Sequence, residues 1–244
     1  MSASPQLRPF SFTVIAATGS RFARFAPYVA AVDRVGVVTF QASLVNGKTG
    51  VYSGSGESLQ VIAEAGDGQI KSVYSHPAVD DCCGVIFYAE LESGRQAVMR
   101  VDLDGLTCLA ETGSRIFRVG PLGPTMSATA LGAARVTERS GQESVLLVSR
   151  DQVFAIPGIE SYHDVAGLPG VDDDGAMMFR AKDGDGYEGI YLWSADTVST
   201  VADTRGSFSE LTRFPMLTGS GTVGFCGVSN DGSSGVYIHK DGQL

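Results

Sequence analysis

The chain has 244 residues, of which 43% are hydrophobic and 18% charged, and its 31 glycines are typical of a turn-rich globular protein rather than a disordered one. A net charge of −9, with no basic cluster, argues against nucleic acid and anionic membrane surfaces as partners. No apolar run is long enough to span a membrane, and the start MSASPQLRPF lacks a secretion signal. The 4 cysteines have no C-x-x-C spacing, which favours reduced, buried thiols. The sequence therefore predicts a cytoplasmic protein.

A short hydrophobic pair recurs along the chain with steps of 47, 47, 47 and 45 residues. The pairs are Ile15-Ala16, Ile62-Ala63, Leu109-Ala110, Ile156-Pro157 and Val201-Ala202. A fixed period of this length is the signature of identical supersecondary units, and it falls in the range of propeller blades. The sequence thus predicts an all-β fold, with residues 1–244 forming a single five-bladed β-propeller.

Each repeat contains strand-forming runs of β-branched and aromatic residues separated by tight turns. The second run of each repeat begins at Gly36, Cys83, Ala130, Gly175 and Gly221. These runs carry a column made of Phe40, Phe87, Ala134, Phe179 and Phe225. The third runs share a column made of Val51, Val98, Val145, Ile190 and Val236. Pairs such as Asn46-Gly47, between the two runs, tolerate positive φ and close hairpins. No segment keeps a 3.6-residue apolar period, so we expect almost no helix.

The two ends of the chain predict how the ring closes. The repeats cover approximately residues 24–67, 68–114, 115–161, 162–207 and 208–244, the last one together with 9–18. The fifth repeat ends at Leu244 without its outer strand, and residues 10–15 provide a strand-forming run of the missing type. Pairing of this run with residues 235–239 would satisfy both exposed sheet edges. We therefore expect the N-terminal strand to complete the last blade.

The fourth repeat resembles a known pattern. Gly189-Ile190-Tyr191, then Val201-Ala202-Asp203-Thr204, then Gly206-Ser207-Phe208 are similar to the tandem G-I-Y, V-A-D-T and G-x-F elements of an uncharacterised bacterial β-propeller repeat family, which also carries V-A-F elements. The pattern extends over the whole chain. The resemblance implies a propeller fold, and because these are framework motifs it transfers no catalytic residue.

Candidate site residues lie in two columns that vary from repeat to repeat. Both columns precede an anchoring column of Ala30, Pro77, Pro124, Pro169 and Pro215 on the innermost strands. The first column contains Arg24, Lys71, Arg118, His163 and Ser209. The second contains Phe25, Ser72, Val119, Asp164 and Glu210. Because the innermost strands of a propeller surround an axial funnel, five different residues predict one asymmetric pocket rather than repeated identical sites.

The residue types in these columns suggest acid–base chemistry on a small organic substrate. Asp164 and Glu210 would lie on neighbouring strands, where one carboxyl group can donate a proton while the other accepts it. His163 beside them could shuttle the proton. The cations Arg24, Lys71 and Arg118 could bind an anionic substrate. This hypothesis describes a hydrolase, lyase or cyclase without metal or cofactor.

Two alternatives stay open. The charged side chains could neutralise one another in a water-filled funnel, with the protein acting as a non-catalytic binder of carbohydrate or protein. Tyr28, Tyr74 and Tyr162, with Phe25, could line the funnel or pack between blades. The turns around Asp172 and Asp183 have the oxygen density of calcium loops without their full pattern, so we interpret them as turn carboxylates. The predicted partner is a small molecule, and the predicted state is a monomer.

Overall fold

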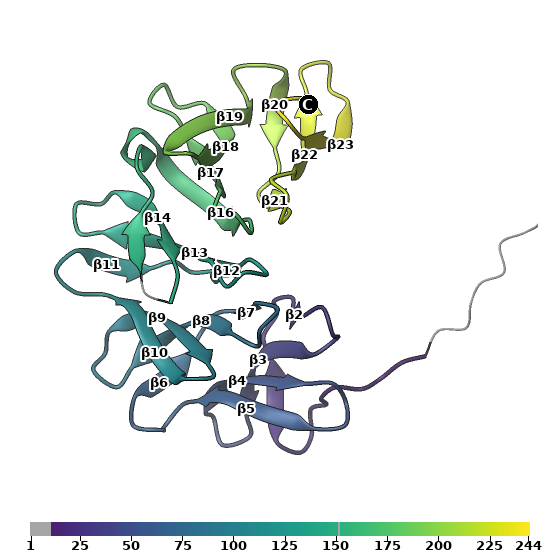
Figure 1. The fold of residues 1–244 in the computed structure, drawn as a ribbon, viewed down its shortest axis with the longest axis vertical. Helices are drawn as coiled ribbons and strands as arrows, with labels where there is room; N and C mark the ends of the chain where they lie inside the picture. The colour runs from purple at the N-terminus through teal and green to yellow at the C-terminus, as the bar shows by residue number, and fades with distance from the viewer. Residues whose placement is uncertain (1–10, 151) are drawn as a thin grey trace, which may run out of the picture.

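Five antiparallel sheets follow one another in chain order along an arc (Figure 1). This computed structural model describes residues 11–150 and 152–244. A single turn of 3-10 helix, η1 (Ile159–Ser161), is the helical segment of the described residues, as the sequence predicted. No helix in this part of the chain is long and apolar enough to cross a membrane.

Each sheet is built from the same succession of strands. The first strand, which is divided in two except in the fourth sheet, comprises β1 (Phe22–Phe25) with β2 (Ala31–Val32), β6 (Ile70–Val73) with β7 (Ala78–Val79), β11 (Ile116–Val119) with β12 (Thr125–Met126), β16 (His163–Val171), and β20 (Phe208–Leu211) with β21 (Met216–Leu217). The second strands are β3 (Val38–Leu44), β8 (Val85–Leu91), β13 (Gly132–Glu138), β17 (Met177–Lys182) and β22 (Val223–Ser229). The third strands are β4 (Thr49–Gly54), β9 (Gln96–Asp102), β14 (Glu143–Val148), β18 (Glu188–Ser194) and β23 (Ser234–His239). The outer strands are β5 (Leu59–Glu64), β10 (Gly105–Glu111), β15 (Val153–Ala155) and β19 (Thr197–Asp203).

The phenylalanine column forms the centre of the sheets, as expected. Its five members are 8%, 0%, 0%, 1% and 3% exposed, in the order Phe40, Phe87, Ala134, Phe179 and Phe225. Every second strand begins two residues later than the sequence predicted. The reason is a turn residue with positive φ at the predicted start, found at Gly36, Cys83, Ala130, Gly175 and Gly221. Hairpin glycines such as Gly47 and Gly94 also have positive φ, which confirms their role as turn residues.

Successive sheets are held together by the third-strand column. Val51 of the first sheet packs among Ile70 and Phe87 of the second, and Val98 of the second sheet packs beside Val119 of the third. The same relation places Val145 in the core of the fourth sheet and Ile190 in the core of the fifth. These four side chains are fully buried at 0% exposure. Each sheet therefore buries its neighbour's side chain as part of its own core.

The expected strand exchange between the two ends is not formed in this structure. Residues 11–17 belong to no strand, residues 9 and 10 lie outside the described residues, and β23 pairs with β22 alone among the pairings of the described chain. Thr13 and Ile15 instead lie beside Gly56 and Gly54 of the first sheet. In Figure 1 the first and fifth sheets form the two ends of the arc, with a gap between them.

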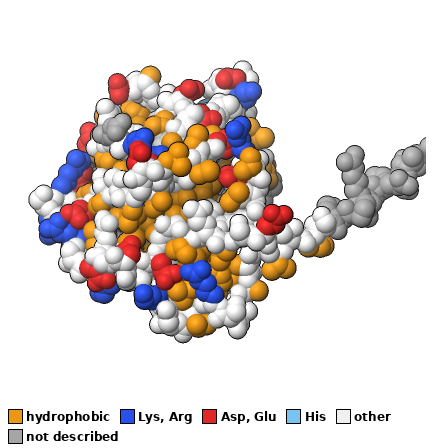
Figure 2. Space-filling view, turned by 60° about the horizontal axis from the view of Figure 1, so that its bottom comes forward, with side chains coloured by type: hydrophobic (Ala, Val, Ile, Leu, Met, Phe, Trp, Pro, Cys, Tyr) orange, Lys and Arg blue, Asp and Glu red, His pale blue; other side chains and the backbone are white. Residues whose placement is uncertain are grey.

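The short inner segments β2, β7, β12 and β21 lie towards the middle of the arc (Figure 1). There β2 lies beside β7, β7 lies beside β12, and β16 lies beside β12 and β21. On the face shown in Figure 2, hydrophobic side chains gather in the middle, while Lys, Arg, Asp and Glu lie mainly around its margin. The breaks in the first strands, at residues 26–30 in the first sheet and 74–77 in the second, therefore open towards the interior of the arc. These breaks create the cavities described next.

Candidate functional site

A cavity of about 510 Å³ lies between the first and second sheets. Its lining consists of Arg24, Phe25, Ala26, Pro27, Tyr28, Gln41, Ser43, Thr49, Val73 and Tyr74. The structure thus brings together four of the residues singled out from the sequence, namely Arg24, Phe25, Tyr28 and Tyr74. The remaining predicted site residues lie elsewhere.

The walls of this cavity are fixed by hydrogen bonds across the two sheets. The Gln41 side chain donates from Nε2 to the Val73 carbonyl oxygen at 3.0 Å, and the Val73 amide donates to Thr49 Oγ1 at 2.7 Å. These bonds attach β6 of the second sheet to β3 and β4 of the first. On the opposite wall, Arg24 pairs with Ser43 in the β1–β3 ladder. The cavity is therefore formed by ordered strands rather than by a loose loop.

The chemistry of the cavity is cationic and aromatic. Arg24 makes neither an ion pair nor a side-chain hydrogen bond with any other described residue, and no carboxylate lines the cavity. The Tyr74 hydroxyl is buried without a hydrogen-bond partner in the described chain. Burial, with a smaller contribution from Glu90, raises the pKa of Tyr74, so the phenol stays neutral. Tyr28 is 41% exposed and presents its ring at the cavity mouth.

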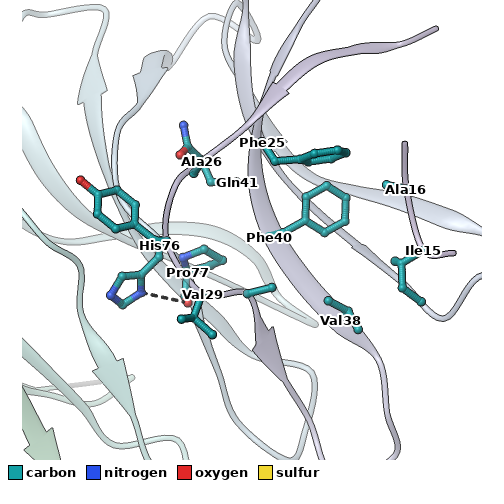
Figure 3. A pocket seen from close by; sticks show the side chains of 12 residues that line it. Ile15, Ala16, Phe25, Ala26, Val29, Val38, Phe40, Gln41, His76 and Pro77 are labelled. Carbon is teal, nitrogen blue, oxygen red and sulfur yellow. Dashed lines mark hydrogen bonds between the residues drawn. The ribbon is translucent and has the colours of Figure 1, made fainter. Parts of the chain in front are cut away.

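A second, apolar hollow of about 210 Å³ adjoins the first and shares Phe25, Tyr28 and Gln41 with it. Figure 3 shows Phe25 and Phe40 between Ile15 and Ala16 on one side and His76 on the other. The ring centroids of Phe25 and Phe40 are 5.5 Å apart. This hollow lies over the core of the first sheet. On the corresponding face, each of the other sheets packs against the third-strand valine or isoleucine of the sheet that precedes it.

His76 is a neutral residue of this apolar hollow. Its Nδ1 lies 3.3 Å from the Pro77 carbonyl oxygen, and its Nε2 is buried without a partner in the described chain. Burial lowers the pKa of His76, and the Pro77 contact opposes this only in part. The Tyr28 ring approaches it edge-on at 6.0 Å between centroids. His76 is not among the residues that the sequence predicted for the site; it directly precedes Pro77 of the anchoring column.

The three residues expected to be catalytic lie outside both cavities. Asp164, at φ 52°, forms an ion pair with Lys182 at 2.9 Å, and its side chain is 63% exposed. The hydrogen bond and charge of Lys182 lower the pKa of Asp164, whereas a proton donor needs a raised one. His163 pairs with Lys182 across β16 and β17, and Glu210 is exposed on β20. Among the described residues no hydrogen bond or ion pair joins Asp164 to Glu210.

The other residues predicted to bind substrate lie in different parts of the molecule. Lys71 is ion-paired with Glu90 at 2.6 Å, and Arg118 donates to Thr137 Oγ1 at 3.5 Å. Tyr162 packs against the rings of Phe179 and Tyr191, at 5.3 and 4.4 Å between centroids. Tyr162 therefore belongs to the aromatic core of the fourth sheet.

The Asp-rich turns are held by backbone amides. Asp172 is 4% exposed and accepts hydrogen bonds from the amides of Asp174 and Ala176 at 3.1 and 2.7 Å. Asp183 accepts two such bonds, from the amides of Asp185 and Tyr187, and forms an ion pair with Arg205. Across residues 11–150 and 152–244, no three His, Cys, Asp or Glu side chains are grouped as metal ligands.

A further varying column, which was not among the sequence predictions, has three members that bond to a neighbouring sheet. It consists of Gln41, Tyr88, Arg135, Arg180 and Cys226 on the second strands. Gln41 bonds to Val73 of the next sheet, the Tyr88 hydroxyl accepts from the Arg135 amide at 3.1 Å, and Arg135 donates to the Val165 carbonyl oxygen at 2.6 Å. The signal was present in the sequence, because this column varies as strongly as the two that were selected.

Comparison with known proteins identifies the fold only. No family model and no curated protein matches the sequence. Among solved structures, a puromycin-hydrolysing peptidase from Mycobacterium tuberculosis is similar with a TM-score of 0.54 and 14% identity, over 88% of this chain and 35% of that one. A lectin from Burkholderia pseudomallei gives a TM-score of 0.50 and 13% identity, over 88% and 67% of the two chains. A gluconolactonase from Xanthomonas campestris gives 0.50 and 14%, over 95% and 85%.

These likenesses extend over nearly the whole described chain but over only about a third of the peptidase. At such identities they establish an architecture and no activity. The antiparallel sheets, their order along an arc and these structural neighbours together show that the chain has a nearly all-β, propeller-type fold.

Proposed function

We propose that this chain is a five-bladed propeller that binds a small organic anion in the cavity between its first and second sheets. One observation carries the proposal: Arg24 lies without a carboxylate partner among the described residues, on the wall of a cavity of about 510 Å³ that also contains Tyr28 and Tyr74. A guanidinium group recognises a carboxylate or phosphate group through paired N–H donors.

The remaining lining completes a site for a ring-bearing ligand. The Tyr28 and Tyr74 rings offer flat apolar surfaces, and Gln41 keeps a side-chain carbonyl oxygen as an acceptor because its Nε2 is committed to Val73. Ligand sites combine such apolar walls with a few placed polar groups. Sugar acids and aromatic carboxylates have the required features, namely one anionic group on a compact ring.

The test is a titration of the whole chain with sugar acids and aromatic carboxylates, each paired with its neutral amide. Arg24→Gln should weaken binding of the acids by at least about tenfold and leave the amides unchanged. Lys48→Gln removes the same charge from an exposed turn of the same sheet and should leave both unchanged. The proposal fails if acids and amides bind the wild type equally, or if Arg24→Gln binds the acids as the wild type does.

A second candidate is acid–base chemistry at Asp164, Glu210 and His163. It is favoured by the backbone of Asp164, whose φ of 52° places a non-glycine residue in a sparsely populated region that is enriched at functional sites. Its reaction would be of hydrolase, lyase or cyclase type. If this chemistry operates, Asp164→Ala and Glu210→Ala should each abolish turnover while the protein stays folded. The candidate is rejected if both variants keep full turnover of a substrate that the Arg24→Gln variant cannot bind.

We also propose ring closure by docking of the fifth sheet on the first, with residues 11–16 between them. The apolar face of the first sheet already holds Ile15 and Ala16. A closed, monomeric ring in a reducing cytoplasm agrees with the four free cysteines, although three of them, Cys82, Cys83 and Cys226, are exposed rather than buried as expected. Size measurement and cell fractionation test the monomeric state and the compartment.

A further inference from the structure

Three arginines approach β16 from the two sheets beside it, two from the third sheet and one from the fifth. Arg135 of the third sheet extends to the fourth, where it donates to the Val165 carbonyl oxygen at 2.6 Å. Gly167, two residues further along β16, lies so close to the fifth sheet that a Cβ there would overlap the carbonyl oxygen of Arg213. The Arg135 side chain and the Arg213 backbone therefore approach the same strand within two residues of each other.

Arg118 joins this group on the face of the third sheet that carries Arg135. Its guanidinium donates to Thr137 Oγ1 at 3.5 Å, and Thr137 follows Arg135 by two positions on β13, so both side chains point to one face. Gly120 leaves room for the arginine stem, since a Cβ there would lie 3.3 Å from Arg135 Nε. We call Arg118, Arg135 and Arg213 the arginine cluster.

The arginine cluster carries positive charge that no contact neutralises in the described part of the chain. None of its members forms an ion pair; Arg118 bonds to a hydroxyl, Arg135 to a carbonyl, and Arg213 lies over the Phe214 ring at 5.6 Å. Burial lowers the pKa of Arg135, and the charges of Arg118 and Arg213 lower it further. The negative charge of Glu143 raises the pKa of Arg135 in part, although the two side chains form no ion pair.

Such a cluster destabilises the folded state unless an anion compensates its positive charge. The chain as a whole has a net charge of −9, and most of its other arginines, including Arg95, Arg115 and Arg205, are paired with carboxylates. Three unpaired guanidinium groups around a partly buried position create a local positive potential in an otherwise anionic protein. Each guanidinium offers a planar fork of donors that fits the oxygen pairs of phosphate and carboxylate groups.

We propose that the arginine cluster is a second binding site, separate from the Arg24 cavity, for a small polyvalent oxyanion that carries several phosphate or carboxylate groups. Several groups are needed because three cations, two from the third sheet and one from the fifth, approach the position. Such a ligand would bridge the third and fifth sheets across β16. Whether the site prefers phosphate or carboxylate groups is decided by comparing one probe of each kind.

The experiment measures binding of pyrophosphate and of citrate by calorimetry at constant ionic strength in chloride. The test variant is Arg118→Gln with Arg213→Gln, because both side chains are exposed and their loss spares the Arg135 bond to Val165. It should weaken binding by at least about tenfold while its melting temperature without ligand stays within a few degrees of the wild type. Tighter binding of pyrophosphate assigns phosphate chemistry, and tighter binding of citrate assigns carboxylate chemistry.

The matched control is Lys48→Gln with Lys240→Gln, which removes the same charge from exposed positions without an ion pair in the described residues. It should bind the probes like the wild type. Probe binding that is lost in Arg24→Gln and kept in the arginine variant belongs to the Arg24 cavity and overturns this proposal, so failure of this site and failure of the Arg24 cavity are distinguishable. The proposal is overturned if the wild type binds neither probe beyond chloride, or if the lysine control loses binding as much as the arginine variant does.

Discussion

Asp80 is a buried carboxylate that holds a turn of this chain through several polar contacts. It is 2% exposed and accepts hydrogen bonds from the amides of Cys82 and Gly84, both at 2.7 Å. It also faces Arg100 at 3.4 Å, and that arginine is itself buried with a side-chain exposure of 8%. Asp33 occupies the corresponding turn of the first sheet and makes the two amide bonds without an ion pair in the described residues.

Replacing Asp80 by alanine should lower the free energy of unfolding by about 2–4 kcal/mol, because two amide hydrogen bonds are lost and the buried Arg100 is left with the Asp102 carboxylate at 3.2 Å as its ion-pair partner. Asp33→Ala should cost only about 1–2 kcal/mol, since it removes turn hydrogen bonds alone. Urea denaturation of both variants measures the difference. Equal losses would show that the Asp80–Arg100 contact contributes nothing beyond the turn.

Asp164 illustrates a residue whose identity could be found in the sequence while its environment could not. The sequence predicted it as one member of a carboxyl pair in which one group donates a proton and the other accepts it, yet Lys182 on the adjacent strand holds it ionised. Because the folded-state pKa lies below the ordinary value of 3.8, the pair favours the folded state above that pH and its contribution disappears as the pH falls further. Strand register, which decides this neighbour, was invisible in the repeat pattern.

Lys182→Gln should raise the pKa of the Asp164 carboxyl group towards 3.8, because the hydrogen bond and charge of the ammonium are lost. Carbon-detected NMR titration of the side-chain carboxyl follows this directly. Lys71→Gln, which removes an exposed partner of Glu90 on another sheet, is the matched control. An unchanged titration of Asp164 in Lys182→Gln would refute the assigned ion pair.

At the scale of the strand, the repeat pattern predicted the central elements well and the inner strands poorly. The phenylalanine column marks β3, β8, β17 and β22, and the valine and isoleucine column marks β4, β9, β14 and β18, because burial in a sheet favours these residue types. The division of the first strand into β1 and β2, or β6 and β7, depends on hydrogen bonds lost around residues 26–30 and 74–77. Since those breaks form the cavity walls, the site could be predicted only in part.

The third-strand column should be the main source of stability between sheets. Val98 is fully buried against the core of the third sheet, so Val98→Ala should cost about 2 kcal/mol of unfolding free energy through the cavity it leaves. Val61→Ala, at a 44% exposed position of β5, should cost far less. Chemical denaturation with both variants is the measurement, and similar costs would contradict the interlocking of sheets through this column.

At the scale of the whole molecule, the two ends of the arc carry complementary apolar surfaces. Val236 is 78% exposed and Ile238 is 62% exposed, although the counterparts of Val236 in the four other sheets are fully buried. The first sheet is the one sheet whose described core, around Phe22 and Phe40, receives no third-strand valine or isoleucine from a preceding sheet. The sequence predicted closure through a different contact, the pairing of residues 10–15 with residues 235–239, which the described residues do not form.

Docking of the fifth sheet on the first gives Val236 the environment that Val98 already has. Val236→Ala should then cost about 2 kcal/mol, close to the cost of Val98→Ala. Leu103→Ala, at a position that is 94% exposed in a turn, should have little effect. Denaturation curves of the three variants decide the matter, and a Val236→Ala curve that superimposes on the wild type would mean that the ends stay apart in solution.

The sharing of one side chain between successive sheets also sets how the molecule opens. In such an array each unit is stabilised mainly by its direct neighbours, so the second, third and fourth sheets have two supports whereas the terminal sheets of an open arc have one. Amide protons of β8, β13 and β17 would then exchange with deuterium most slowly, and those of β3 and β22 sooner. A closed circle would abolish this gradient, because no sheet would be terminal.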